Sequence, residues 1–110
     1  MNVYILTLFP EMFSPVVNTS IVKRAQEQDL VRITTVDLRD FAHDAHKTVD
    51  DYPYGGGPGM VLKCEPIFEA VESLRSAETR VVLMCPTGRR FDQSAAKDLS
   101  ASAHLLLLCP

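Results

Sequence analysis

The stretch VYIL, residues Val3-Tyr4-Ile5-Leu6, is a short and almost continuous apolar run. Such a run predicts a β-strand that is buried on both faces, as in a parallel sheet. A helix is expected next, since Pro10 suits a first helical turn and Glu11 suits the positive end of the helix dipole. Apolar residues then recur every four positions, at Phe13, Val17, Ile21 and Ala25. We expect one helix that runs to Asp29 and packs this stripe on the sheet.

The alternation of apolar runs and amphipathic segments continues along the chain. Further strands are predicted at Val31–Val36, Val81–Met84 and Leu105–Leu108, and further helices at Pro66–Leu74 and Asp92–Leu99. This order predicts an α/β fold with a mostly parallel sheet and flanking helices. In such sheets ligands bind beyond the carboxyl ends of the strands.

Length and composition limit the class of protein. A chain of 110 residues with 46% hydrophobic and 23% charged residues is ordinary for a single globular domain, here residues 1–110. The net charge of −3 argues against a uniformly basic surface, although Arg89-Arg90 forms a local basic patch. Three separated cysteines without a Cys-x-x-Cys pair indicate neither a disulfide framework nor a zinc site and favour a cytoplasmic setting. No apolar run approaches the length of a membrane span, so neither secretion nor membrane insertion is expected.

The segment from Leu38 to Lys63 departs from the alternation, and its centre reads VDDYPYGGGPGM at residues 49–60. Loops of this length in compact domains are usually functional or disordered. Large apolar side chains are expected to anchor this one on a core, unlike a disordered linker. They are Phe41, Tyr52, Tyr54 and Met60. The glycines permit positive φ or close approach of the backbone to a partner, while the alternative is a turn that only connects two elements.

The polar residues of this segment are compatible with few known kinds of site. The glycine spacing matches neither a dinucleotide-binding loop nor a P-loop. No metal site is predicted, because the available ligands lack the spacing of a strong zinc pattern. Those ligands are His43, Asp44, His46, Asp50, Asp51 and Cys64. The two adjacent aspartates either form an acid–base pair or accept hydrogen bonds from amides of the turn. Cys85, at a strand end, is interpreted as a small buried residue rather than a nucleophile.

Four blocks of sequence carry a family resemblance. They are Leu8–Phe13 (LFPEMF), Arg39–Phe41 (RDF), His46–Asp51 (HKTVDD) and Pro53–Met60 (PYGGGPGM). Together they resemble the bacterial tRNA (guanine-N1)-methyltransferases of the SPOUT class, and the match runs from Leu6 to Cys109. The resemblance implies a homodimer with a deep trefoil knot that binds S-adenosylmethionine. It also implies transfer of the methyl group to N1 of the guanosine immediately 3′ of the tRNA anticodon.

The resemblance further implies roles for individual residues. The loop Leu83-Met84-Cys85-Pro86-Thr87-Gly88 is expected to line the adenosine part of the cofactor site, with Met84 and Cys85 where relatives carry Leu and Ser. The glycine-rich segment is expected to receive the anticodon loop, through Asp50, Tyr54, Gly59 and Met60. Tyr52 stands where relatives often have Arg, so stacking is expected to replace a phosphate contact. For Tyr54 the alternative is packing alone. The participation of a divalent ion is left open.

The resemblance implies more chain than residues 1–110. Relatives continue past the strand at Leu105–Leu108 into loops that complete the knot and enclose the cofactor, and their proposed catalytic base lies beyond the position of Pro110. We therefore expect an incomplete knot here and no catalytic base. Two interpretations follow. Residues 1–110 are either part of a complete methyltransferase or a non-catalytic fragment with little cofactor binding, an open sheet with Leu105–Leu108 at an exposed edge.

Overall fold

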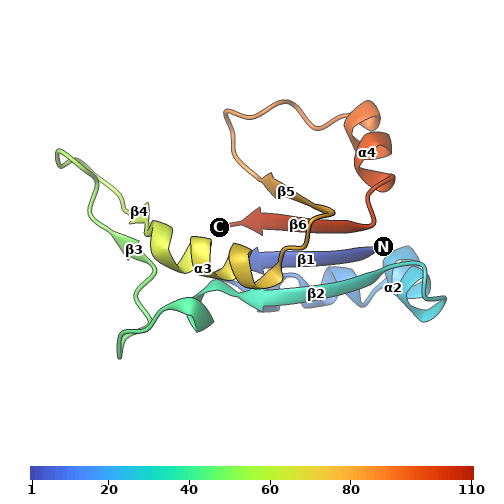
Figure 1. The fold of residues 1–110 in the computed structure, drawn as a ribbon, viewed down its shortest axis with the longest axis horizontal. Helices are drawn as coiled ribbons and strands as arrows, with labels where there is room; N and C mark the ends of the chain where they lie inside the picture. Colours follow the sequence, from blue (N-terminus) through green and yellow to red (C-terminus); the bar gives the residue numbers. More distant parts are fainter.

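The computed structural model describes all residues from Met1 to Pro110. Four parallel strands form one sheet in the order β2-β1-β6-β5. The strands are β1 (Asn2–Thr7), β2 (Arg32–Asp37), β5 (Thr79–Leu83) and β6 (His104–Cys109). Figure 1 shows that their carboxyl ends point toward the same side of the molecule. The α/β class and the four strands predicted for the sheet are confirmed.

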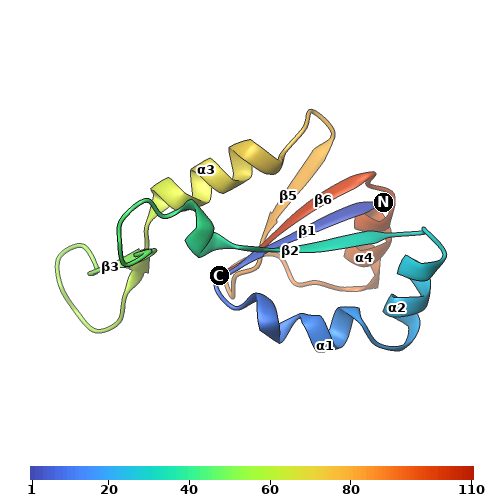
Figure 2. The same ribbon diagram turned by 90° about the horizontal axis from the view of Figure 1, so that it is seen from below.

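Helices cover both faces of this sheet (Figure 2). They are α1 (Ser14–Val17), α2 (Ser20–Glu27), α3 (Cys64–Leu74) and α4 (Gln93–Ser100), with 3-10 helices η1 (Pro10–Met12) and η2 (Leu38–Phe41). On one face α3 and η2 pack over a cluster that includes Leu6 and Leu106. On the other face residues before and within α1, together with α4, pack against Val3, Ile5 and Leu105. Alternate residues of the inner strands therefore contribute to two separate cores.

β6 is an inner strand, which corrects the expectation that Leu105–Leu108 lies at an exposed edge. It pairs with β1 on one side and β5 on the other. Leu106 is fully buried. The edges are β2 and β5, and in β5 the side chains of Val81 and Leu83 are 48% and 56% exposed. The continuous apolar run of β6 is explained by this inner position, where both faces of the strand are covered.

The predicted helix from Pro10 to Asp29 is wrong in its continuity. It divides into η1, α1 and α2, with a break at Asn18 and Thr19. The Thr19 hydroxyl donates a hydrogen bond to the Pro15 carbonyl. Side chains of this type compete with the helix for backbone groups, and they favour helix ends over helix interiors.

The break also changes which residue of the apolar stripe follows Val17 on the inward side. Val17 is half-buried, as the four-residue spacing predicted, but the next inward side chain is Val22. Ile21, which was expected to face the sheet, is 75% exposed. The expected position of Ile21 is therefore wrong, because the spacing of a helix is preserved only while the helix is continuous. Ala25, the last residue of the predicted stripe, is half-buried as expected.

The glycine-rich segment contains a hairpin that the sequence did not predict. β3 (Asp50–Asp51) pairs in antiparallel fashion with β4 (Val61–Leu62). The amide of Lys63 donates to the carbonyl of Val49 at 2.8 Å and extends this pairing toward the sheet. Figures 1 and 2 both show the hairpin projecting beyond the carboxyl ends of the main strands.

The hairpin is anchored at its base and not at its tip. Val49 is 1% exposed and belongs to the same core cluster as the residues beneath α3. Phe41 packs against that cluster as expected. By contrast, Tyr52, Tyr54 and Met60 are 80%, 99% and 52% exposed, so the expectation that they anchor the segment is wrong.

No helix of the fold combines the length and apolar character needed to cross a membrane.

Candidate functional site

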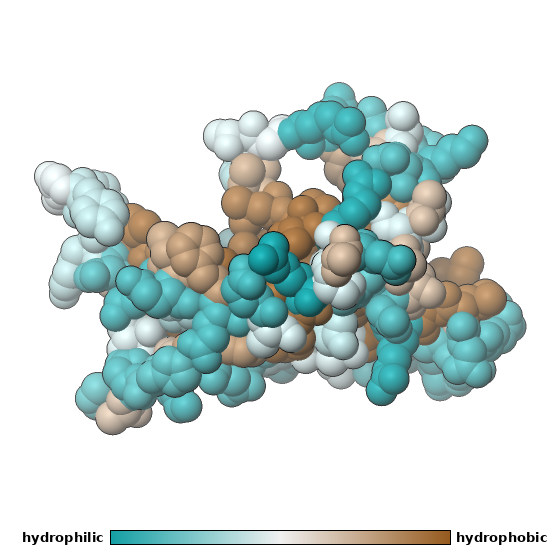
Figure 3. Space-filling model, viewed as in Figure 1, coloured by the Kyte–Doolittle hydropathy of each residue, from teal (hydrophilic) through white to brown (hydrophobic).

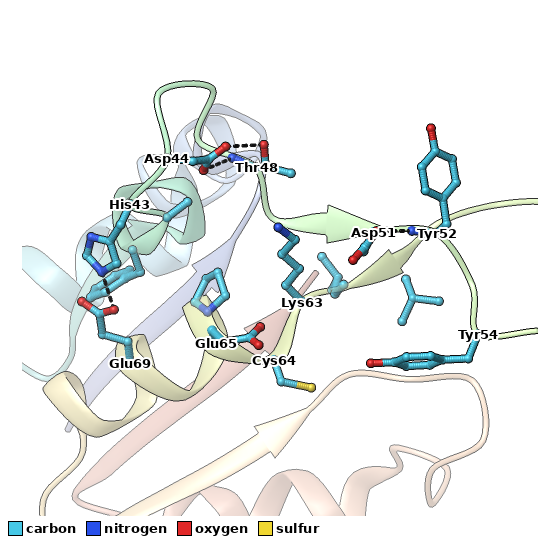
Figure 4. A pocket seen from close by; sticks show the side chains of 15 residues that line it. His43, Asp44, Thr48, Asp51, Tyr52, Tyr54, Lys63, Cys64, Glu65 and Glu69 are labelled. Atoms are coloured by element: carbon cyan, nitrogen blue, oxygen red, sulfur yellow. Dashed lines mark hydrogen bonds and ion pairs between the residues drawn. The ribbon is translucent and has the colours of Figure 1, made fainter.

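A pocket of about 510 Å3 opens between the base of the hairpin and the first turns of α3 (Figure 4). It is lined by Phe41, Ala42, His43, Asp44, Thr48, Asp51, Tyr52, Tyr54, Val61, Leu62, Lys63, Cys64, Glu65, Pro66 and Glu69. The pocket lies on the side of the molecule where the parallel strands end. Ligands of parallel α/β sheets bind on that side, which makes the pocket a candidate binding site.

Two pairs of side chains shape the rim of this pocket, and Figure 4 shows both. His43 Nε2 lies 2.6 Å from Glu69 Oε2 and connects the segment after η2 to α3. Thr48 donates its amide to Asp44 Oδ1 at 2.8 Å and its hydroxyl to Oδ2 at 2.5 Å. These hydrogen bonds from Thr48 hold the pKa of the Asp44 carboxyl below its ordinary value. A turn closed by the charged Asp44 carboxylate therefore leads into the hairpin.

Asp51 serves the backbone of the hairpin. Its Oδ1 accepts a hydrogen bond from the amide of Tyr52 at 2.8 Å. For Asp51 this confirms the alternative in which the carboxylate bonds to an amide of the turn. Asp50, its neighbour in β3, lies opposite Leu62 and is half-buried. Its role in substrate binding stays a prediction.

The glycines of the turn are required by backbone conformation. Gly55, Gly56, Gly57 and Gly59 have φ between 77° and 111°. Residues other than glycine rarely adopt such φ values, so the glycines have the conformational role that was predicted for this segment. An added Cβ would meet no atom within 4 Å at any of the four positions. The backbone of the turn is thus open to an approaching partner rather than packed against the chain.

The structure brings only some of the predicted substrate residues to the pocket. Tyr54 and Tyr52 line it from the turn, and in Figure 4 their rings extend in different directions. Asp50, Gly59 and Met60 are not part of the lining. The roles that the resemblance implies for these residues stay predictions.

The predicted cofactor loop, Leu83–Gly88, begins at the last residue of β5 and is exposed along its length. The amide of Met84 donates to the carbonyl of Leu108 at 3.0 Å, which fixes the start of the loop to β6. None of its residues lines the pocket at the hairpin. Figures 1 and 2 both show the loop and the tip of the hairpin apart. Residues 1–110 therefore carry two separate candidate sites.

Cys85 is exposed, which corrects its interpretation as a small buried residue. Its Sγ lies 3.4 Å from Thr87 Oγ1. The side-chain hydrogen bond from Thr87, followed by bonds from the amides of Thr87 and Gly88, holds the pKa of the Cys85 thiol below its ordinary value. The loop turns back on itself here, since the amide of Gly88 also donates to the carbonyl of Cys85 at 3.3 Å.

Other residues of the pocket were not predicted from the sequence. The pair of His43 and Glu69 joins positions 26 residues apart, and no local pattern marks such a contact. The turn from Asp44 to Thr48 was open to prediction, because a short acidic side chain before a turn often bonds to nearby amides.

The available metal ligands do not converge, since no three or more His, Cys, Asp or Glu side chains are grouped to hold an ion.

Comparison with known proteins places the chain in a family. All of residues 1–110 match the family model described as tRNA (Guanine-1)-methyltransferase TrmD. The chain is 52%, 53% and 51% identical to the proteins called tRNA (guanine-N(1)-)-methyltransferase of Staphylococcus carnosus, Geobacillus kaustophilus and Bacillus subtilis. Each comparison covers 99% of this chain and 45% or 46% of the relative, so the chain spans about half the length of the curated relatives it matches. Since the family model covers both candidate sites and the whole sheet, the chain belongs to the tRNA (guanine-1)-methyltransferase family.

Proposed function

We propose that residues 1–110 form the N-terminal portion of an enzyme that transfers a methyl group from S-adenosylmethionine to N1 of the guanosine immediately 3′ of the tRNA anticodon. The observation that carries this proposal is the family match over the whole chain, with 51–53% identity to curated methyltransferases. The parallel sheet also supports it, because the loop Leu83–Gly88 and the hairpin both lie exposed at the carboxyl ends of the strands, where ligands of such sheets bind.

We assign the loop Leu83–Gly88 to the adenosine part of the cofactor. Leu83 and Met84 present apolar side chains that are 56% and 50% exposed, and these suit the faces of a purine ring. The amide of Gly88 donates to the carbonyl of Cys85 at 3.3 Å and keeps the turn narrow. The residues present therefore fit one wall of an adenosine site. When bound, S-adenosylmethionine would supply a methyl group on a sulfonium, whose sulfur leaves as a neutral thioether. The loop binds and orients the adenine ring.

We assign the hairpin to the substrate base. Asp50 makes no ion pair within the chain, which leaves its carboxylate available to accept hydrogen bonds from the edge of guanine. Tyr54 offers an exposed ring for stacking, and Met60 adds apolar surface. Gly59, with φ at 89°, lets the backbone approach an unstacked base. The N1 of neutral guanine carries a proton, so transfer also needs a base, which none of these residues is proposed to be.

We further propose that the protein is a homodimer in the cytoplasm. Support for a covered surface comes from η1 and α1, where the apolar side chains of Met12 and Val16 are 69% and 65% exposed. Support for a reducing compartment comes from the cysteines at positions 64, 85 and 109, all of which are free. The partner that the enzyme recognises is the anticodon loop of tRNA.

Methyl transfer by the full-length protein tests the function. With labelled S-adenosylmethionine and a tRNA transcript that has guanosine 3′ of the anticodon, we expect labelled 1-methylguanosine in the nucleoside digest. A transcript with adenosine at that position is the matched control and should stay unlabelled. Absence of transfer to the guanosine transcript would contradict the proposal.

The substitution Asp50→Asn tests the substrate role of the hairpin. We expect kcat/KM for tRNA to fall by about tenfold or more, because a hydrogen bond to a charged acceptor is lost. The affinity for S-adenosylmethionine, measured by calorimetry, should stay unchanged. Wild-type methylation by the Asp50→Asn variant would remove the role of this carboxylate and leave the function itself standing.

A further inference from the structure

The loop between β5 and α4 continues from the cofactor segment into Arg89-Arg90-Phe91. All three side chains are exposed, and Phe91 is 65% exposed. In Figure 1 the loop forms an arch that stands away from the sheet. In Figure 3 hydrophilic residues cover much of this arch and α4, while apolar surface lies beneath it. Two cationic side chains and an aromatic ring are therefore presented together to the solvent.

The neighbouring carboxylates have other partners. Asp98 of α4 binds Arg80 of β5 at 2.9 Å, and Asp92 caps α4 by accepting a hydrogen bond from a helix amide at 2.8 Å. The hydrogen bond and charge of Arg80 hold the pKa of the Asp98 carboxyl below its ordinary value, with a smaller contribution from Arg89. Neither Arg89 nor Arg90 forms an ion pair. Both guanidinium groups keep N–H donors free for an external acceptor.

The pocket at the hairpin has the opposite charge. Its lining includes four carboxylates and a single lysine, namely Asp44, Asp51, Glu65, Glu69 and Lys63. Such a surface repels phosphate groups. Binding of RNA depends strongly on neutralised phosphates, so a strand whose base reaches the hairpin needs cationic contacts elsewhere on the protein.

We propose that Arg89, Arg90 and Phe91 form a contact surface for the RNA backbone, separate from the hairpin that is assigned to the substrate base. This inference rests on the proposed function, because tRNA is the polyanion concerned. Guanidinium groups bind phosphate oxygens through paired hydrogen bonds, and an exposed ring stacks on an unpaired base. The surface continues directly from Leu83–Gly88, so RNA held there lies beside the loop assigned to the cofactor.

Charge reversal in the full-length protein tests the surface. The test variant is Arg89→Glu/Arg90→Glu, and the matched control is Arg24→Glu/Arg32→Glu, which changes the net charge equally at exposed arginines of α2 and β2. Binding of an unmodified anticodon stem-loop transcript is measured by fluorescence anisotropy over a range of salt. We expect Kd to rise by about tenfold or more in the test variant and the slope of log Kd against log salt to fall by about two, with little change in the control. Calorimetric binding of S-adenosylmethionine should be the same in both variants.

The aromatic part of the surface is tested separately. Phe91→Ala is expected to weaken binding of the stem-loop by about fivefold or more with no change in the salt slope, because stacking involves no counterion. Phe68→Ala on α3 is the matched control, since Phe68 is 66% exposed. It should leave the affinity unchanged.

Each outcome has a distinct meaning. Equal losses in the two double variants would show an effect of net charge and overturn the surface. Unchanged affinity in Arg89→Glu/Arg90→Glu, with normal binding by the wild type, would overturn the surface but not the methyltransferase function. Wild-type protein that neither binds nor methylates tRNA would overturn both. Polyglutamate, added at the same concentration of negative charge as the stem-loop, is the competitor. If it displaces the stem-loop and Phe91→Ala has no effect on binding, the loop binds polyanions in general and the assignment to RNA is wrong.

Discussion

At the scale of single residues, Cys85 shows how local hydrogen bonds change the chemistry of a side chain. Its thiolate is stabilised by the hydroxyl and amide of Thr87, while burial raises the pKa of the Cys109 thiol. The two cysteines lie at the ends of neighbouring strands but have opposite shifts. The reactivity of these thiols should therefore differ, since the thiolate is the nucleophile.

Alkylation of Cys85 tests this difference in reactivity. Its rate with iodoacetamide, followed by peptide mass spectrometry, should rise with pH at a lower pH than the rate of Cys109. Thr87→Val should move the profile of Cys85 to higher pH, because the side-chain donor that stabilises the thiolate is removed. The profile of Cys109 is the internal control. An unchanged profile of Cys85 in Thr87→Val would contradict the assigned cause.

At the scale of elements, the end of α2 contains an unfavourable residue. The amide of Leu30 donates to the carbonyl of Ala25 at 2.9 Å, and that of Asp29 to Gln26 at 3.1 Å. This pattern is a Schellman motif, and Asp29 occupies its left-handed position with φ at 57°. Glycine is usual there, and a carboxylate also lies at the negative end of the helix dipole.

We therefore predict that Asp29→Gly stabilises the protein. The free energy of unfolding in urea should rise by about 0.5–1 kcal/mol, because the left-handed strain and the unfavourable charge are both removed. Asp29→Asn should give a smaller increase, since it removes the charge and keeps a side chain. A lower stability for Asp29→Gly would show that the entropy gained by the unfolded chain outweighs the relief of strain.

The secondary-structure elements differ in how far the sequence predicts them. The strands at Val3–Leu6 and Leu105–Leu108 were predictable because an apolar run identifies a strand buried on both faces. The break at Asn18 was missed because a four-residue spacing says nothing of polar side chains that bond to the backbone. The pairing of Asp50–Asp51 with Val61–Leu62 was missed because two-residue strands carry no pattern, and aspartate is depleted in strands.

The candidate site was predictable in part for related reasons. The need for glycine at positions such as Gly55 follows from residue type, and the structure confirms it. The exposure of Tyr54 was not predictable, because apolar character alone cannot separate a residue that packs from one that is presented to solvent. The convergence of His43 on Glu69 depends on how α3 docks, which is a property of the tertiary fold.

In the molecule as a whole, the core is centred on the two inner strands, β1 and β6. Leu106 is fully buried between β1 and β5, whereas Leu83 on the edge strand is 56% exposed. We predict that Leu106→Ala lowers the free energy of unfolding by about 3 kcal/mol, since the lost contacts leave a cavity. Leu83→Ala is the matched control and should cost less than about 1 kcal/mol, because much of that side chain is already in water. Urea unfolding measures both, and similar losses would contradict the inner position of β6.

The position of β6 also has a consequence for the order in which the chain acquires its structure during synthesis. β1 can pair with β2 as soon as residue 37 has left the ribosome, but β5 has no partner in the sheet except β6. Register partners such as Val3 and Leu105 lie at opposite ends of residues 1–110, so the central pairing carries a large cost in chain entropy. Until β6 is made, the apolar edge of β1 is open and β5 remains unpaired. The nascent chain should therefore stay sensitive to proteases and chaperones at least until residue 109 emerges.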